Sequence, residues 1–252
     1  MNLLKEIAGR IWATWGLISF ILTFIIIFPF SMIAYLLPEP AGTHYLIRIS
    51  RVWMRVWMFL IACPLKIKGQ ENFEKGKSYI VTCNHNSLLD IPLSSPFIPG
   101  PNKTIAKTGF ARIPFFGWFY AKGSVLVDRK SEKSRKQSFE KMRWVLKTGM
   151  HMCIYPEGTR NRSQEPLKPF YNGAFKLAYD TQTEIIPAII SGTKEAVPLH
   201  KTFFFLPRKL EIKFLPPVSP QNLSASELKA KIYEIMKTAV LNGTSSNKTR
   251  QN

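Results

Sequence analysis

The chain has 252 residues and is strongly basic, because 35 lysines and arginines against 16 aspartates and glutamates give a formal net charge of +19. This length suits one α/β domain with a sizeable core plus an appendage, and it excludes a chain of several large domains. The charge predicts a polyanionic neighbour: nucleic acid, anionic lipid headgroups or a phosphorylated substrate. Cys63, Cys83 and Cys153 lack the spacing of metal ligands, so the sequence indicates no metal site. Cys83 and Cys153 lie on predicted buried strands as apolar packing residues, which suits a reducing compartment.

The first predicted element is an apolar helix. Residues 11–37 contain no charged side chain, and the run is long enough to cross a bilayer or to lie deeply in one leaflet. A cleaved signal peptide is the rival interpretation, but the run is too long and residues 38–40 (Pro-Glu-Pro) form a poor cleavage site. Pro29 predicts a kink, and a helix that turns back instead of spanning stays open.

Residues 45–61 predict a second helix with a basic stripe. Its arginines recur at i, i+3 and i+7, and tryptophans occupy part of the remaining surface. Arginine together with tryptophan favours an interfacial helix that touches anionic headgroups. The alternative is a helix packed on the rest of the protein with its arginines in solvent. The residues concerned are Arg48, Arg51, Arg55, Trp53 and Trp57.

From residue 64 onward, short apolar strands alternate with helical stretches, which predicts an α/β domain around a mainly parallel or mixed sheet. Serine at 224 and glutamate at 227 predict a capping box that opens a C-terminal helix to about residue 240. The predicted strands are 79–83, 104–107, 124–127, 151–155, 185–190 and 209–214, and the predicted helices are 87–93, 132–147 and 174–180.

The chain is therefore predicted to have three parts. Residues 1–63 form a membrane-associated two-helix segment, and residues 64–241 form the α/β domain. Residues 242–252 are polar and predict a disordered tail.

The segment after the predicted strand 79–83 carries a candidate acid–base pair. His85 and Asp90 stand five residues apart where a strand gives way to a helix. A carboxylate that accepts one imidazole N–H fixes the tautomer and stabilises the imidazolium, so the other ring nitrogen can take a proton from an attacking hydroxyl. The alternative is a structural histidine near a helix N-terminus, since this spacing arises by chance about a quarter of the time.

Three later segments favour the acid–base pair over a structural histidine. They are residues 123–129 (Gly-Ser-Val-Leu-Val-Asp-Arg), residues 155–160 (Tyr-Pro-Glu-Gly-Thr-Arg) and the buried strand 185–190. Together with residues 84–90, and in this order, they resemble the four motifs of the glycerolipid acyltransferase superfamily. The resemblance extends to its bacterial 1-acylglycerol-3-phosphate O-acyltransferase group and covers about residues 64–220.

The resemblance implies an acyl transfer without a cofactor or an enzyme nucleophile. His85 would remove the proton from the acceptor hydroxyl, and Asp90 would orient His85. The implied acceptor is lysophosphatidic acid, and the implied donor is acyl-CoA or acyl-carrier protein. Arg129 and Arg160 stand where the family recognises phosphate, which an arginine fork binds in bidentate fashion. The further predicted substrate-binding residues are Lys107, Glu157, Gly158 and Thr159.

Two details of this site stay open. Glu157 can hold Arg129 or Arg160 in place, or it can bond the glycerol. Backbone N–H groups near Gly158, or at the helix start around residues 86–87, are candidate donors to the tetrahedral oxyanion.

Other functions are also compatible with the sequence. Another lysolipid acceptor, such as a lyso-ornithine lipid or a lysophospholipid, would change the headgroup and keep the His–Asp chemistry. A basic membrane-binding or nucleic-acid-binding protein is the non-enzyme alternative, but the apolar N-terminus favours anionic membrane lipid, and no nucleic acid is expected. If the first helix spans, the positive-inside rule places the basic domain on the cytoplasmic face of the cell membrane, whereas Lys5 and Arg10 favour a monotopic hairpin.

Overall fold

A seven-stranded sheet forms the centre of the part of the chain that the computed structural model describes, residues 3–128 and 130–248. Its strands are β1 (Leu65–Lys68), β2 (Ile80–Cys83), β3 (Asn102–Lys107), β4 (Ser124–Val127), β5 (His151–Ile154), β6 (Ile185–Ser191) and β7 (Leu210–Phe214). They lie in the order β1-β7-β6-β2-β5-β3-β4. Every neighbouring pair is parallel except β6 and β7, which are antiparallel, so the predicted mixed α/β fold is confirmed.

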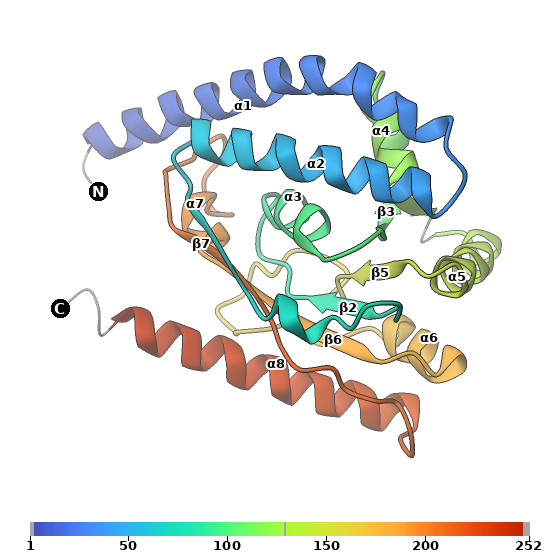
Figure 1. Cartoon of the computed structure of the whole chain (residues 1–252). Coiled ribbons are helices and arrows are strands. Elements are labelled where there is room, and N and C mark those ends of the chain that lie inside the picture. Colours follow the sequence, from blue (N-terminus) through green and yellow to red (C-terminus); the bar gives the residue numbers. More distant parts are fainter. Residues whose placement is uncertain (1–2, 129, 249–252) are drawn as a thin grey trace.

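Helices cover both faces of this sheet (Figure 1). One face carries α1 (Leu3–Met32), α2 (Ala41–Leu60) and α3 (Asp90–Ser94), and the other carries α5 (Glu132–Lys147), α6 (Gly173–Thr181) and α8 (Ala225–Lys248). The short helices α4 (Phe116–Lys122) and α7 (Thr193–Ala196) follow β3 and β6 along the chain. The 3-10 turns are η1 (Ile33–Tyr35), η2 (Gln70–Asn72), η3 (Ser95–Phe97) and η4 (Thr108–Arg112).

Strand β2 shows why the sequence forms three layers. Successive side chains of a strand point to opposite faces of a sheet. Val81 and Cys83 accordingly join the core under α2 and α3, whereas Ile80 joins the core under α5, α6 and α8. A central parallel strand buried on both faces needs an almost continuous apolar run, which is the pattern that predicted it.

The sequence predicted six of these strands to within two residues at each end, and it predicted α5 with its observed bounds. It missed β1, in which half-buried and exposed residues alternate at the edge of the sheet, and it missed α4. The helix predicted at 87–93 begins only at Asp90. Residues 87–89, which were predicted to open the helix, form a loop instead, because the N–H groups of Asn86 and Ser87 both donate to the Asp90 carboxylate.

The C-terminal helix opens with the predicted capping box. Ser224 N–H donates to Glu227 Oε2 over 2.8 Å, and Glu227 N–H donates to Ser224 Oγ over 3.3 Å. The predicted disordered tail starts at residue 242, whereas α8 runs to Lys248. Once a helix is nucleated, each further residue adds a hydrogen bond, and polar residues weaken it only slightly. Residues 249–252 lie outside the described residues.

Helices α1 and α2 form an antiparallel pair that lies along the sheet domain (Figure 1). Trp12 Nε1 donates to the Ile61 carbonyl over 3.1 Å, and Trp57 Nε1 donates to the Gly16 carbonyl over 3.2 Å. Pro29 lies inside α1, which continues past it to Met32. Helix α1 with η1 is long and apolar enough to cross a membrane, by length and composition.

The structure corrects the predicted surface of α2. Trp53 and Trp57 are buried in the core that the helix pair shares with the sheet, so they cannot contact headgroups. Arg51 donates to the carbonyls of Pro96 and Ile98 over 2.6 and 3.0 Å. The alternative of a packed helix therefore describes most of α2, and of its three arginines only the first and last are exposed.

Glu39 ties the turn between α1 and α2 to the sheet domain. Its Oε1 lies 3.1 Å from Nζ of both Lys103 and Lys122, and Thr43 N–H donates to its Oε2 over 3.1 Å. Burial alone would raise the pKa of Glu39, but these hydrogen bonds and charges outweigh burial and lower its pKa to about 2. The carboxylate is therefore charged throughout the working pH range.

We expect Glu39→Ala to lower the free energy of unfolding by about 3 kcal/mol, because it leaves the buried Lys103 ammonium without its anionic partner. Thermal unfolding in detergent measures the change. The matched control is Glu74→Ala, which breaks an ion pair with Lys77 whose side chains are 59% and 51% exposed, and it should cost under about 1 kcal/mol. Equal losses in the two variants would contradict the prediction.

His151 makes the stability of the fold depend on pH. Its Nδ1 accepts the Tyr79 N–H over 3.0 Å, and burial of the ring lowers its pKa from 6.5 to about 4. The unfolded chain therefore binds a proton below about pH 6.5 that the folded chain refuses until about pH 4, and stability falls across this window as the pH drops.

We expect the free energy of unfolding to be about 2 kcal/mol lower at pH 5 than at pH 8 from this residue. Unfolding of wild type and His151→Asn at both pH values measures it. The variant loses the titrating ring and should show a smaller difference between the two pH values. The same difference in both proteins would exclude His151 as the cause.

Candidate active site

The structure brings His85 and Asp90 together at the end of β2. His85 lies in the loop after the strand, and Asp90 is the first residue of α3. His85 Nδ1 lies 2.8 Å from Asp90 Oδ2, with the His85 side chain 14% exposed and that of Asp90 fully buried. Because a carboxylate only accepts, Nδ1 carries a proton, and in the neutral ring Nε2 keeps a lone pair. No hydrogen bond from the described residues engages Nε2, so it is available to a substrate.

Four donors hold the Asp90 carboxylate. Besides His85, the N–H groups of Asn86 and Ser87 donate to Oδ2 over 2.6 and 2.7 Å. Thr193, at the start of α7, donates through its hydroxyl to Oδ1 over 2.7 Å. The sequence reasoning missed Thr193, since it stands 103 residues from Asp90 and carries no local signal.

Glu157 is bound to the backbone on both of its oxygens. His85 N–H donates to Oε1 over 2.7 Å, and Lys168 N–H donates to Oε2 over 2.9 Å. The residue is only 1% exposed. Burial raises the pKa of Glu157, and the two backbone hydrogen bonds partly offset this. The Asn161 N–H donates to the His85 carbonyl over 2.6 Å, so the same loop contacts both polar groups of the His85 backbone.

Tyr155 forms a wall beside the imidazole. Its ring centroid lies 4.6 Å from that of His85, and its hydroxyl lies 2.7 Å from Ser94 Oγ. Burial raises the pKa of Tyr155 well above 10, so the phenol stays neutral. Ser94 is a further contact that the sequence did not predict.

The predicted substrate-binding residues that the structure describes lie at the same edge of the sheet as His85. Strands β2, β3 and β5 are parallel, and parallel strands end at one edge. Lys107 is exposed at the end of β3, and Arg160 is half-buried in the loop that follows β5. Thr159 is exposed, and Lys168 Nζ donates to its hydroxyl oxygen over 2.7 Å. Gly158 has φ = 70°, a left-handed conformation that favours glycine. The predicted Arg129 lies outside the described residues.

Three of the backbone N–H groups that the sequence suggested for the oxyanion already have acceptors in the protein. The N–H groups of Asn86 and Ser87 already donate to Asp90, and the Gly158 N–H donates to the Tyr155 carbonyl over 3.0 Å. No group of three or more His, Cys, Asp or Glu side chains gathers as a metal site in the described residues.

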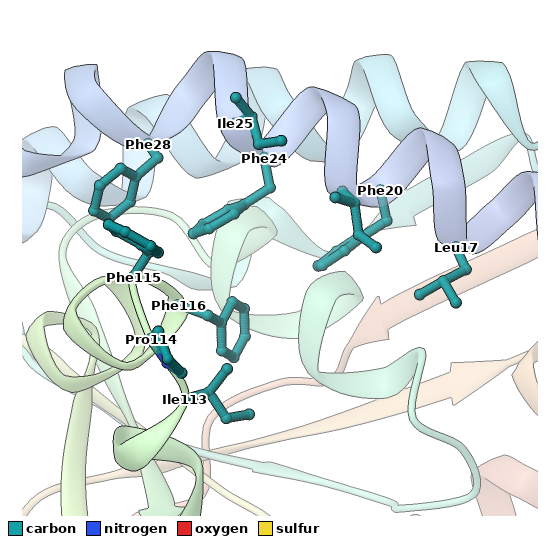
Figure 2. Close-up of a pocket in the computed structure, with 10 residues that line it drawn as sticks. Leu17, Phe20, Phe24, Ile25, Phe28, Ile113, Pro114, Phe115 and Phe116 are labelled. Atoms are coloured by element: carbon teal, nitrogen blue, oxygen red, sulfur yellow. The ribbon is translucent and has the colours of Figure 1, made fainter.

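An apolar groove of about 620 Å³ lies between α1 and the start of α4. Figure 2 shows side chains of α1 pointing toward the loop side chains on the opposite wall. The groove has almost no polar lining, which suits a hydrocarbon chain. Its walls are Leu17, Phe20, Ile21, Phe24, Ile25 and Phe28 from α1, and Ile113, Pro114, Phe115 and Phe116 from the loop.

A model of the acyltransferase family matches residues 64–191 of this chain, which include His85, Asp90 and Glu157. The chain belongs to the acyltransferase family. A 1-acyl-sn-glycerol-3-phosphate acyltransferase of Saccharomyces cerevisiae is 30% identical to this acyltransferase over 204 residues, which cover 79% of this chain and 67% of that protein.

Other relatives of this acyltransferase agree with that assignment. An enzyme of the same name from Cocos nucifera is 31% identical over 65% of this chain and 53% of its own length. The alpha form from Mus musculus is 28% identical over 73% of this chain and 65% of its own length. The chain thus spans between about half and two thirds of these curated relatives.

The fold is shared with a solved structure. The crystal structure of the lysophosphatidic acid acyltransferase PlsC from Thermotoga maritima superposes with a TM-score of 0.80 at 24% identity. The match covers 94% of this chain and 97% of that chain, so it includes the N-terminal helix pair as well as the sheet domain.

Proposed function

We propose that this acyltransferase moves a fatty acyl group from an acyl thioester to the free hydroxyl of 1-acylglycerol-3-phosphate, making phosphatidic acid for phospholipid biosynthesis. The observation that carries the proposal is the His85–Asp90 pair, with Nδ1 bound to the buried carboxylate and Nε2 available. Membership of the acyltransferase family supports the reaction class. The names of the Saccharomyces, Cocos and mouse relatives support the acceptor.

In this reaction His85 Nε2 takes the proton of the acceptor hydroxyl as its oxygen attacks the thioester carbonyl. The new C–O bond forms a tetrahedral oxyanion, and Asp90 stabilises the imidazolium across the 2.8 Å contact with Nδ1. Collapse of this intermediate breaks the C–S bond, and the departing thiolate receives the proton from His85. The ester, the free thiol and the neutral imidazole are the products, so the protons balance within one cycle.

The surroundings of His85 favour a hydroxyl supplied by the substrate. Ser87, the serine nearest to His85 in the sequence, is fully buried, and its Oγ accepts the Leu89 N–H. Cys83 is also buried, and its contact with the Cys153 side chain, together with burial, raises the pKa of its thiol well above 9. Neither side chain is suited to act as a nucleophile.

The acceptor phosphate has cationic candidates at the same edge of the sheet. Arg160 can offer a bidentate fork, and Lys107 can add a point charge. Thr159 and Gly158 stand beside Arg160 in the loop, and Thr159 is an exposed residue. Arg129 is proposed for the same role from its place in the sequence motif.

The apolar groove between α1 and the start of α4 is proposed to hold hydrocarbon from a substrate or the surrounding lipid. Its volume of about 620 Å³ lies in the range of small-molecule sites. Because one wall is α1, a chain in this groove would lie next to the element that meets the membrane.

We propose that α1 attaches the protein to one leaflet. Phe204 and Phe205 of the sheet domain pack at Gly9 and Gly16, and Phe24 contacts Phe119 of α4. A helix packed along the domain at these points supports attachment to one leaflet over a span across the bilayer. Its outward side is apolar, which suits burial among acyl chains, and the basic domain then faces the anionic headgroups of the cytoplasmic face. Exposed apolar residues on α1 include Ile11, Ile18, Leu22, Ile25 and Ile26.

The test is an assay of purified protein in detergent for thioester consumption and lipid product. Donors are acyl-CoA and acyl-carrier protein, and acceptors are lysophosphatidic acid, a lyso-ornithine lipid and lysophospholipids. Phosphatidic acid formed by wild type supports the proposal. Turnover only with another lysolipid would overturn the acceptor and keep the chemistry. Salt-dependent nucleic-acid binding with no turnover on any acceptor would overturn the enzymatic assignment.

A further inference from the structure

The carboxylate of Glu157 lies in the motif assigned to substrate recognition, yet its contacts are with the protein itself. Its two oxygens accept the N–H groups of His85 and Lys168 over 2.7 and 2.9 Å. The residue is 1% exposed, against the exposed Thr159 two positions later. A carboxylate in this position has little surface left with which to reach a glycerol or a phosphate.

The loop that carries Glu157 also binds the other polar group of the His85 backbone. Asn161 N–H donates to the His85 carbonyl over 2.6 Å. Asn161 is itself held in a tight turn, since its side chain accepts the Ser163 N–H over 3.0 Å and donates to the Glu165 carbonyl over 2.9 Å. The backbone of His85 is thus held on both sides by one loop, while Asp90 holds its ring.

We propose that Glu157 is a positioning residue that fixes the backbone of the general base, and that it is not a ligand of the acceptor. This inference rests on the proposed function only in naming His85 as the base. Asp90 sets the rotation of the imidazole, but the position of Nε2 also depends on where the His85 backbone sits. Two hydrogen bonds hold that position: the His85 N–H donates to Glu157, and the His85 carbonyl accepts from the Asn161 N–H. An error of about 1 Å in such a position can cost about 10²-fold in rate.

The diagnostic variant is Glu157→Gln. The amide has nearly the shape of the carboxylate, but it offers one acceptor oxygen where two N–H groups each need one. Its NH₂ group must therefore oppose the N–H of His85 or that of Lys168. Glu165→Gln is the matched control, since it removes the same charge from an exposed position of the same loop.

We would label the imidazole nitrogens with ¹⁵N in the full-length chain and record their spectra without substrate. The chain has 4 histidines, and loss of signals in His85→Ala identifies those of His85. Wild type and Glu165→Gln should show His85 as a single tautomer with the proton on Nδ1. Glu157→Gln should show a mixture of tautomers. The signals of the buried His151 should stay unchanged and so report an intact core.

Kinetics give the second readout. Glu157→Gln should lower kcat by about 10- to 10²-fold and leave KM for lysophosphatidic acid within about twofold. Unchanged His85 signals together with a raised KM would overturn the proposal and make Glu157 a substrate ligand.

If the His151 signals show that Glu157→Gln has not folded, Glu157→Asp is measured instead. Its shorter side chain cannot reach both N–H groups, so wild-type His85 signals and kcat in that variant would also overturn the proposal. Failure of the proposed function is distinguishable, because the spectra need no turnover: a wild type without acyl transfer would remove the reaction and still show whether Glu157 holds His85.

Discussion

Replacing His85 with alanine is expected to lower kcat by at least ~10²–10⁴-fold, the usual contribution of a positioned general base. The variant removes the imidazole whose Nδ1 contacts the buried Asp90 carboxylate, and with it the Nε2 that would take the proton. KM for lysophosphatidic acid should change little, because the proposed phosphate contacts are made by other residues. Steady-state formation of phosphatidic acid by purified protein, with acyl-CoA as donor, measures both constants.

The matched control for this change is His200→Ala, which removes an exposed histidine from a turn. It should keep wild-type kcat, and both variants should melt near the wild-type temperature. A His85→Ala protein that melts normally and retains activity within a few-fold of wild type would exclude His85 as the base. If activity falls as expected, the residual rate of His85→Ala reports binding and charge stabilisation alone.

Asp90 is expected to show a graded loss that separates its charge from its orienting role. In Asp90→Asn, the amide oxygen can still accept from Asn86, Ser87 and the imidazole, and the NH₂ group can donate to the Thr193 hydroxyl in place of Oδ1. The geometry survives, but a neutral amide stabilises the imidazolium less. A hydrogen bond to a charged group is worth about 1.5–3 kcal/mol, and the neutral amide forfeits part of this stabilisation, so we expect kcat to fall by up to about 10- to 10²-fold.

Asp90→Ala should be more severe and approach the ~10²–10⁴-fold loss of His85→Ala, because it releases the ring and leaves two N–H groups without their acceptor. It should also lower the melting temperature, which Asp90→Asn should largely preserve. Phosphatidic acid formation and thermal unfolding of both variants test this. Equal kinetic losses would contradict the separation, and would mean that charge alone, or orientation alone, accounts for the role of Asp90.

The predicted parts of the site share one property: their signals are local. His85 and Asp90 are close in sequence and bracket a loop, so their contact follows from the spacing once β2 is recognised. The residues around them are not of this kind. Thr193 reaches Asp90 from 103 positions away, and Lys168 and Asn161 reach Glu157 and His85 through a loop whose path no local pattern shows.

The surface of α2 is the clearest case in which sequence reasoning failed. Arginine and tryptophan occur in interfacial helices as readily as in packed ones, so composition alone did not distinguish the two. The distinction depends on which element packs against α2. The partner is α1, which buries Trp53 and Trp57, while two carbonyls of the sheet domain bind Arg51. The candidate oxyanion donors show the same dependence on the fold, since the N–H groups of Asn86 and Ser87 already donate to the Asp90 carboxylate.

The sequence by itself predicted six of the seven described strands, the apolar N-terminal helix, the candidate acid–base pair and the reaction class, because periodicity, charge and short motifs act over a few residues. Only the tertiary structure decided which faces are buried, that Glu157 binds backbone N–H groups, and that α1 lies along the sheet domain. These depend on which distant segments meet. In this protein the adjacent parallel strands β2, β5 and β6 bring those segments to one edge, where residues far apart in the chain hold a single histidine.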